Sequence, residues 1–379
     1  MKDANNTDCK EVFYALLRSG LWERSVQLIP FGKINYSLLY QFAEDQSVVG
    51  LIAAGLEHVE DVKVLKVDAL PFLKKVFSLE QRNVAMNEFI RVIVERMRSA
   101  GIYTTLVKGQ GVAQCYARPQ WRSSGDIDFF LSDENYDKAK SLLIPMASKV
   151  EDEFLREKHL GMTIDSWTVE LHGTLYGGPS SRVEKELDDI KHDTFIGGNV
   201  RAWQNEDVSV FMLSVENDVF YIFTHILQHF YKGGIGLRQI CDWCRLLWTY
   251  RSTLDVKSLE GRVKRAWLKS EWKAFGVFAI DYLGMPLEAM PLLDSKSLSS
   301  VRIKRQAERI KDFVMMSGNF GQNRDMSYYS KYPYLIRKTI SFGRRIGDLG
   351  RHAMIFPLDS IRFFPSILFN GVQSVLRGE

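Results

Sequence analysis

The chain has 379 residues, 46% of them hydrophobic and 25% charged, which is the composition of an ordinary globular protein. Wholesale disorder, a collagen-like chain and a coiled coil are therefore excluded. The formal net charge of +4 is too small to indicate a dedicated nucleic-acid binder, and the length predicts about two to three domains.

Cysteine content and the lack of an apolar leader predict a soluble cytoplasmic protein. Four cysteines are too few to staple a secreted scaffold of this length, and they suit a reducing compartment. The N-terminus has neither the basic start nor the apolar run of a signal peptide, and nowhere do 18 apolar residues run together.

The first 77 residues show the spacing of short helices. Val12, Leu16 and Leu17 recur with helical period, and the stretch 38–56 is rich in apolar residues without alternation. We expect a helical N-terminal region over residues 1–77.

A long helix is predicted next, beginning at a capping box over residues 78–81, where Ser78 would cap backbone N–H groups and Gln81 would reach back. One apolar stripe then follows the helical period through Met86, Ile90, Ile93 and Met97. Gly101 stands where a C-terminal cap is expected.

Strands and short helices follow in alternation up to residue 213. The predicted order is a strand at 102–107, a short helix at 110–117, a strand at 125–131, a helix from residue 133 or 134, and strands near 162–164 and 167–172. Helices dominate again from residue 214. The sequence thus predicts an α+β fold: an α/β core with a small mixed sheet at 78–213, between helical regions at 1–77 and 214–379.

Three acidic residues are predicted to share one face of the sheet. Asp126 and Asp128 are two residues apart on one strand, so both carboxylates point the same way. On the strand 168–172, Glu170 and His172 share a face by the same alternation. If the two strands are neighbours, Glu170 completes a three-carboxylate cluster suited to one or two divalent cations.

A candidate phosphate site precedes this cluster. The strand that ends at Lys108-Gly109 runs into a helix whose first N–H groups have no partner within the helix. Lys108 adds a point charge, and Arg122 could reach the same anion through two N–H groups.

These motifs resemble the nucleotidyltransferase superfamily that includes DNA polymerase beta and the kanamycin nucleotidyltransferases. The segments LVKGQGVAQCYARPQWRSSGDIDFFL and VELHGTLY carry the likeness, and HILQHFYKGGIGLRQICDW extends it. More narrowly, the chain resembles a branch of uncharacterised bacterial nucleotidyltransferases, which has Lys-Gly where better-known members have Gly-Ser.

The resemblance implies roles for individual residues. Asp126, Asp128 and Glu170 would be catalytic and would hold Mg²⁺, with Mn²⁺ as an alternative. Glu170 would also help to activate the acceptor hydroxyl. Nucleotide contacts are implied at Lys108, Gly109, Arg122, Ser123, His172 and Arg238. The absent Gly-Ser removes a serine hydroxyl expected on a phosphate.

The predicted function is metal-dependent transfer of a nucleoside monophosphate from an NTP such as ATP to a hydroxyl acceptor, for instance a sugar or small metabolite, with release of pyrophosphate. Two alternatives remain open. One is a catalytically degenerate, nucleotide-binding regulatory module. The other is a sugar-nucleotide glycosyltransferase, which also uses an Asp-x-Asp motif.

Weaker signals have simpler interpretations. Arg238 and Asp242, four apart on a predicted helix, suggest a surface ion pair. His225 and His229 lack the glutamate of a zinc-protease helix, although one of them could line the cleft. The last 49 residues carry eight Lys/Arg and three acids, so contact of this end with a membrane surface is a lesser alternative.

Overall fold

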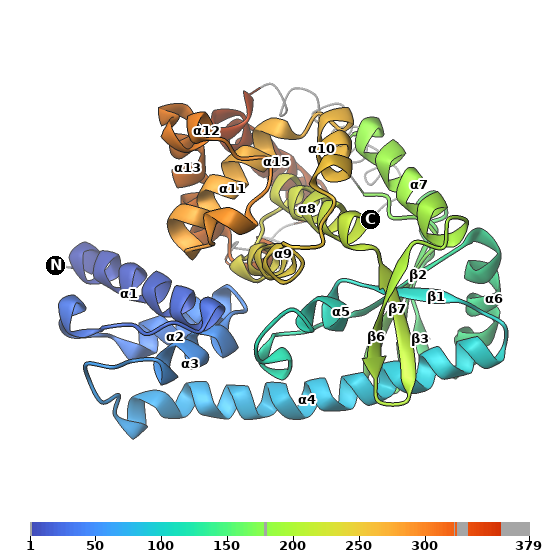
Figure 1. Cartoon of the computed structure of the whole chain (residues 1–379), viewed down its shortest axis with the longest axis horizontal. Helices are drawn as coiled ribbons and strands as arrows, with labels where there is room; N and C mark the ends of the chain where they lie inside the picture. The colour runs from blue at the N-terminus through green and yellow to red at the C-terminus, as the bar shows by residue number, and fades with distance from the viewer. Residues whose placement is uncertain (1, 178–179, 322, 324–332, 358–379) are drawn as a thin grey trace.

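In the computed structural model of the chain, which describes residues 2–177, 180–321, 323 and 333–357, one mixed sheet lies between helical regions (Figure 1). The predicted α+β class is therefore confirmed. Within the described residues, no helix combines the length and the apolar character that a membrane span requires.

The N-terminal region is helical, as predicted. It contains α1 (Lys2–Trp22), α2 (Tyr36–Asp45) and α3 (Val49–Glu57). Helices α1 and α3 pack backbone to backbone, because a Cβ atom on Gly55 would lie only 2.1 Å from the carbonyl oxygen of Leu16. The two glycines Gly20 and Gly55 make this close approach possible.

Helix α4 (Lys66–Ser99) is 34 residues long and runs under both the N-terminal helices and the sheet (Figure 1). The prediction that Ser78 caps its start is wrong, since Ser78 lies inside the helix. The buried stripe begins earlier, with Phe72 and Val76. Burial of these side chains keeps the segment helical, although Pro71 disfavours a helix and the cap-like motif at 78–81 resembles a helix start. Residue 78, the predicted domain boundary, thus falls within one helix.

Seven strands form the sheet in the order β3-β4-β5-β2-β1-β7-β6. They are β1 (Thr104–Val107), β2 (Ile127–Leu131), β3 (Ala147–Val150), β4 (His159–Ile164), β5 (Trp167–His172), β6 (Val200–Asn205) and β7 (Val208–Leu213). Strands β2 and β5 pair in parallel, whereas β2 is antiparallel to β1 and β5 to β4. Strands β1, β2, β4 and β5 confirm predictions; β3 and the β6–β7 hairpin were not predicted.

Side-chain alternation on β2 divides the molecule into two layers. Ile127, Phe129 and Leu131 join the core formed with α4 and α6 (Asp133–Leu143). Phe130 joins the second core on the opposite face, and Asp128 shares that face.

Two helices flank these strands. Helix α5 (Gly109–Ala113) follows β1 and is shorter than the predicted 110–117. Helix α7 (Ser181–Phe195), which was not predicted, precedes β6.

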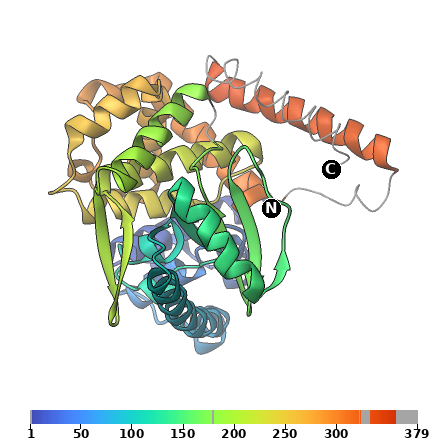
Figure 2. The same ribbon diagram turned by 90° about the vertical axis from the view of Figure 1, so that its right-hand side faces the viewer.

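The C-terminal region is helical, as predicted. Its helices are α8 (Val215–Lys232), α9 (Leu237–Thr249), α10 (Val256–Arg265), α11 (Lys269–Leu283), α12 (Ser295–Ser299), α13 (Val301–Ser317) and α15 (Tyr334–Ile355). All four cysteines of the chain are buried and free. Figure 2 shows α15 projecting from the body of the molecule, and it ends just before Pro357. The suggested membrane contact falls partly on residues 358–379, which lie outside the described residues.

Candidate active site

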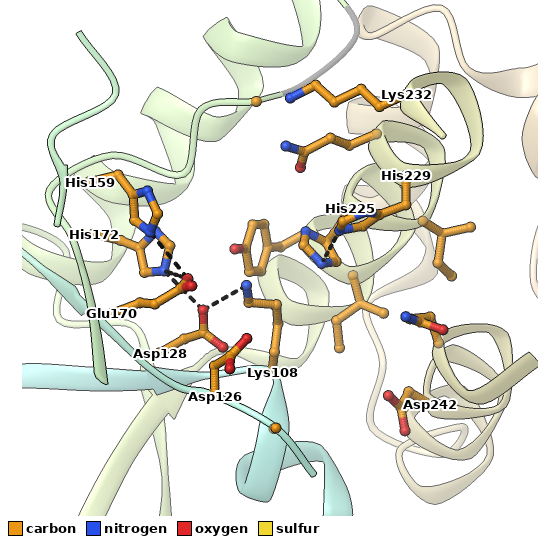
Figure 3. A pocket seen from close by; sticks show the side chains of 18 of the residues that line it. Lys108, Asp126, Asp128, His159, Glu170, His172, His225, His229, Lys232 and Asp242 are labelled. Atoms are coloured by element: carbon orange, nitrogen blue, oxygen red, sulfur yellow. Dashed lines mark hydrogen bonds and ion pairs between the residues drawn. The ribbon is translucent and has the colours of Figure 1, made fainter. Parts of the chain in front are cut away.

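A cleft of about 1190 Å³ lies between one face of the sheet and the helices α8 and α9 (Figure 3). Strands β2 and β5 supply acidic residues on one side, and α8 and α9 supply histidine, tyrosine, arginine and aspartate on the other. The cleft therefore brings together polar groups from distant parts of the sequence.

The three predicted carboxylates meet at this cleft. Asp128 on β2 is the direct register partner of Glu170 on the parallel strand β5. Asp126 directly precedes β2 rather than lying on it as predicted, yet Figure 3 shows its carboxylate beside that of Asp128. The predicted pairing of the two strands is what places Glu170 next to the aspartates.

The surroundings of Asp126 and Glu170 shift their pKa values in opposite directions. Partial burial, together with the negative charges of Glu170 and Asp128, raises the pKa of Asp126. Burial also tends to raise the pKa of Glu170, but the imidazoles of His159 and His172, whose Nε2 atoms lie 3.2 and 3.3 Å from Oε2, outweigh it and hold that pKa well below its usual range. Glu170 is therefore firmly ionised, while Asp126 carries a negative charge that its surroundings disfavour.

Lys108 points into the acidic cluster from the end of β1. Its Nζ lies 2.8 Å from Asp128 Oδ1. Burial tends to lower the pKa of Lys108, but the charge of Asp128 outweighs this effect and raises it. The backbone of Lys108 has φ of 58°, a sparsely populated region for a residue with a side chain, and Gly109 follows with φ of 42°. This strained turn aims the ammonium group at the carboxylates.

Two histidines complete the acidic side. His172 Nε2 lies 2.9 Å from Asp128 Oδ1 and 3.3 Å from Glu170 Oε2. Burial lowers the pKa of His172, but hydrogen bonds to these two carboxylates raise it above its ordinary value. His159 on β4, which the sequence did not single out, places its Nε2 3.2 Å from Glu170 Oε2.

Arg122 lines the cleft but does not reach out as a predicted anion clamp. Its guanidinium donates two hydrogen bonds to Asp242, Nε to Oδ1 at 2.7 Å and Nη2 to Oδ2 at 2.6 Å. The Tyr116 hydroxyl donates to the same Asp242 Oδ1 at 2.7 Å. Both charged side chains are buried, so this pair joins the loop before β2 to α9.

Arg238 also differs from its predicted arrangement. The predicted site is not at the surface: Asp242 is buried and holds the Arg122 guanidinium through both of its carboxylate oxygens. Arg238 Nη1 donates to the carbonyl oxygen of Ser123 at 2.9 Å. Burial, and then the charge of Arg122, lowers the pKa of Arg238 to about 10. Arg238 and Ser123 both line the cleft.

The loop before β2 is held from below by α4. Asn83 Nδ2 donates to the carbonyl oxygens of Gln120 and Arg122 at 2.6 and 2.8 Å, and Gln110 Nε2 donates to Asn83 Oδ1 at 2.8 Å. The signal for this role is a polar residue within the buried apolar stripe of a helix, and sequence reasoning missed it.

Helix α8 forms the opposite side of the cleft. Tyr221, His225 and His229 all line it, so both histidines face the cleft, where one was predicted. The two imidazoles contact each other through their Nε2 atoms at 3.1 Å. Burial, with the charge of Lys108 second, lowers the pKa of His225 well below its ordinary value and that of His229 to about 4. Both histidines are therefore neutral near pH 7.

Two donor sets in the cleft could hold a divalent cation. Asp126, Asp128 and Glu170 offer only oxygen atoms. His159, Glu170 and His172 place one ligand atom each within 4.8 Å of one another. No other group of three or more such side chains in the described part of the chain is as closely spaced, so the carboxylate oxygens of Asp126, Asp128 and Glu170 lie farther apart than this.

Comparison with known proteins gives one match. A family model described as uncharacterised nucleotidyltransferase matches residues 32–277, more than half of the chain. The matched segment includes the whole sheet, α8 and α9, and so every residue of the cleft named above. Neither the curated proteins nor the solved structures gave a significant match.

Proposed function

The chain belongs to the family of uncharacterised nucleotidyltransferases, and from that premise we propose that it transfers a nucleoside monophosphate from an NTP to a hydroxyl acceptor. Pyrophosphate is the second product. The acceptor is a sugar or another small hydroxylated metabolite that enters the cleft.

One observation carries the proposal. The parallel pairing of β2 with β5 sets Asp128 opposite Glu170, beside Asp126 and within reach of Lys108, on the open side of a large cleft. Negative groups that bind a cation thus adjoin a positive group that binds phosphate, as nucleotide chemistry requires.

The acidic residues fit a bound divalent cation. Carboxylate oxygens are the ligands that Mg²⁺ and Mn²⁺ accept. Burial, and then the negative charges of Glu170 and Asp128, raise the pKa of Asp126, and a cation would neutralise that charge. We assign Asp126, Asp128 and Glu170 as the residues that hold it. When bound, the cation would offset the charge of the phosphate oxygens.

The reaction needs little covalent chemistry from the protein. An acceptor oxygen bonds to the α-phosphorus while the bond from that phosphorus to the bridging oxygen of the β-phosphate breaks. The Glu170 carboxylate, which lines the cleft, accepts the hydroxyl proton. Lys108 and Arg238 direct positive charge toward the phosphates, and His172 holds Asp128 and Glu170 in place.

A second candidate is a regulatory module that binds nucleotide without transferring it. Gly109 takes the place of the serine in the Gly-Ser of better-known members, and Lys108 before it forms an ion pair with Asp128. This pair favours a site that binds phosphate but is poorly arranged for catalysis. The family match favours nucleotidyl transfer over glycosyl transfer.

Isothermal titration of ATP, GTP, CTP and UTP, each with and without Mg²⁺, tests the proposal. We expect at least one NTP to bind only when Mg²⁺ is present. Asp126→Asn should abolish this binding with no loss of stability, because no hydrogen bond or ion pair to Asp126 is found among the described residues. Unchanged Mg²⁺-dependent binding in that variant would contradict the assignment.

Transfer itself is tested with an α-labelled NTP and a panel of sugars and small hydroxylated metabolites. Labelled product together with pyrophosphate supports the enzyme. Nucleotide binding without pyrophosphate release across the panel supports the regulatory module.

A further inference from the structure

A cluster of nitrogen and oxygen ligand atoms lies on the β4 side of the carboxylates. His159 on β4 and His172 on β5 are register partners on antiparallel strands, so both side chains stand on the same face of the sheet. Glu170, two residues before His172, shares that face. Figure 3 shows both imidazoles turned toward the Glu170 carboxylate.

The distances between the ligand atoms are compatible with a shared metal ion. The Nε2 atoms of His159 and His172 lie 3.2 and 3.3 Å from Glu170 Oε2. In a tetrahedral site with metal–nitrogen distances of about 2.1 Å, neighbouring ligand atoms are separated by about 3.4 Å. An ion could therefore be held by these side chains with little movement of the backbone.

The two imidazole rings stack on each other, so rotation about their side-chain bonds would direct both Nε2 lone pairs at one ion. His159 and His172 stack with centroids 4.7 Å apart and planes at 19°. Phe154 stacks on the other side of His159, at 5.8 Å and 17°. This stacking restricts the motion of the His159 ring. The three ligand side chains line the cleft and are 13–27% exposed, and the Nε2 atom of His159 is itself buried without a hydrogen-bond partner.

Imidazole nitrogens decide which ion would bind. Mg²⁺ and Ca²⁺ prefer oxygen ligands, whereas first-row transition ions accept imidazole readily. We propose that His159, Glu170 and His172 form a binding site for a divalent transition ion of the Zn²⁺, Co²⁺ or Mn²⁺ type, with Asp128 Oδ1 at its edge. This site shares Glu170 with the proposed nucleotidyl-transfer site. The proposal depends on the two histidines, however, and does not require that a nucleotide is transferred.

Cobalt absorption tests the site without any activity measurement. Metal-free protein at pH 7.5, with no nucleotide, is titrated with CoCl₂ while the visible d–d bands are recorded. We expect one Co²⁺ to bind with the bands of a nitrogen-ligated ion, and ZnCl₂ to displace it. Excess MgCl₂ should leave the bands in place.

Variants locate the ion. His159→Gln and His172→Gln should each weaken Co²⁺ binding at least tenfold, since loss of a ligand costs no less than loss of a group behind it. His58→Gln is the matched control, because His58 also lies 3.1 Å from a glutamate oxygen but is remote from the cleft. Its Co²⁺ affinity should equal that of the wild type. Thermal unfolding of each variant shows whether it is folded.

Two results would overturn this site: a wild type without d–d bands, or folded His159→Gln and His172→Gln variants that bind Co²⁺ as the wild type does. The proposed function is judged separately, because Asp126→Asn should retain the Co²⁺ bands while losing Mg²⁺-dependent nucleotide binding.

Discussion

Arg122 with Asp242, and Lys108 with Asp128, are both pairs of opposite charge that line the same cleft, yet their atoms are engaged to different degrees. In the first pair, two N–H groups meet both carboxylate oxygens, and the side chains are only 5% and 8% exposed. In the second, a single ammonium contacts one oxygen of an acidic cluster that faces the cleft.

The difference separates structure from chemistry. A buried bidentate pair with a third hydrogen-bond donor has no capacity left for a ligand, so Arg122 and Asp242 fasten a loop to a helix. The Lys108 cluster contains more acid than base and lines the cleft, so it can exchange partners when a ligand enters. Four experiments examine this contrast.

Asp242→Ala should give the largest change. It leaves the Arg122 guanidinium buried without its counter-charge, so we expect the free energy of unfolding to fall by about 3–5 kcal/mol in urea titrations. Asp137→Ala, which removes an exposed partner of Lys140, should cost less than about 1 kcal/mol. Equal losses of unfolding free energy in the two variants would show that the buried pair does not stabilise the contact between the loop and α9.

Asp128→Asn should lower the rate of nucleotidyl transfer, or the affinity for NTP with Mg²⁺, at least about 100-fold, equivalent to about 2.7 kcal/mol. The reason is that this carboxylate is central to the proposed cation site. A pyrophosphate-release assay and calorimetry measure the two quantities. Retention of both would remove Asp128 from the site.

Lys108→Met should act in opposite directions on the two ligands. Loss of the ammonium should weaken NTP binding about tenfold, or about 1.4 kcal/mol. It should also strengthen Mn²⁺ binding in the absence of nucleotide, because Lys108 no longer neutralises Asp128. Calorimetry with MnCl₂ and with NTP measures both, and Lys149→Met on the exposed strand β3 is the control. A fall in both affinities would mean that Lys108 only supports the fold.

The smallest expected effect is on stability at acidic pH. His229 has a folded-state pKa of about 4, against about 6.5 when unfolded, and it faces Lys108, Lys232, Arg238 and His225. The unfolded chain therefore binds more protons between these values, so stability is full above about pH 6.5 and falls as pH drops toward 4. His229→Gln should lose at least about 1 kcal/mol less than the wild type between pH 7 and pH 4.5 in urea titrations. Parallel curves would contradict this.

Local patterns predicted much of this molecule. Alternation on β2 and β5 correctly predicted that Asp128 and Glu170 share one face and that Val169 and Leu171 lie in the core. Side chains alternate between the two faces of a strand, so burial of the apolar set fixes the face of the polar set. Helical periodicity predicted α4, although not its start. Strand β6, which is exposed on alternate residues and contains Arg201 and Gln204, carried too weak an apolar signal.

Long-range partners were the part that local patterns could not predict. Arg122 was expected to bind an anion, and the anion turned out to be Asp242, far along the chain. His159 gains its place only through the register of β4 against β5. Such pairings depend on tertiary packing, which spacing along one segment does not encode.

Helix α4 decides how this protein can be divided for experiments. It spans about 50 Å and buries Phe72 and Val76 against the N-terminal helices, while Met86 and Ile90 belong to the core under the sheet. A shorter chain that starts at Ser78 would contain only part of α4. The apolar side chains that pack across this cut would then be exposed to solvent. A shortened chain that contains the sheet and the cleft should therefore retain the entire helix together with the N-terminal region that covers its first half.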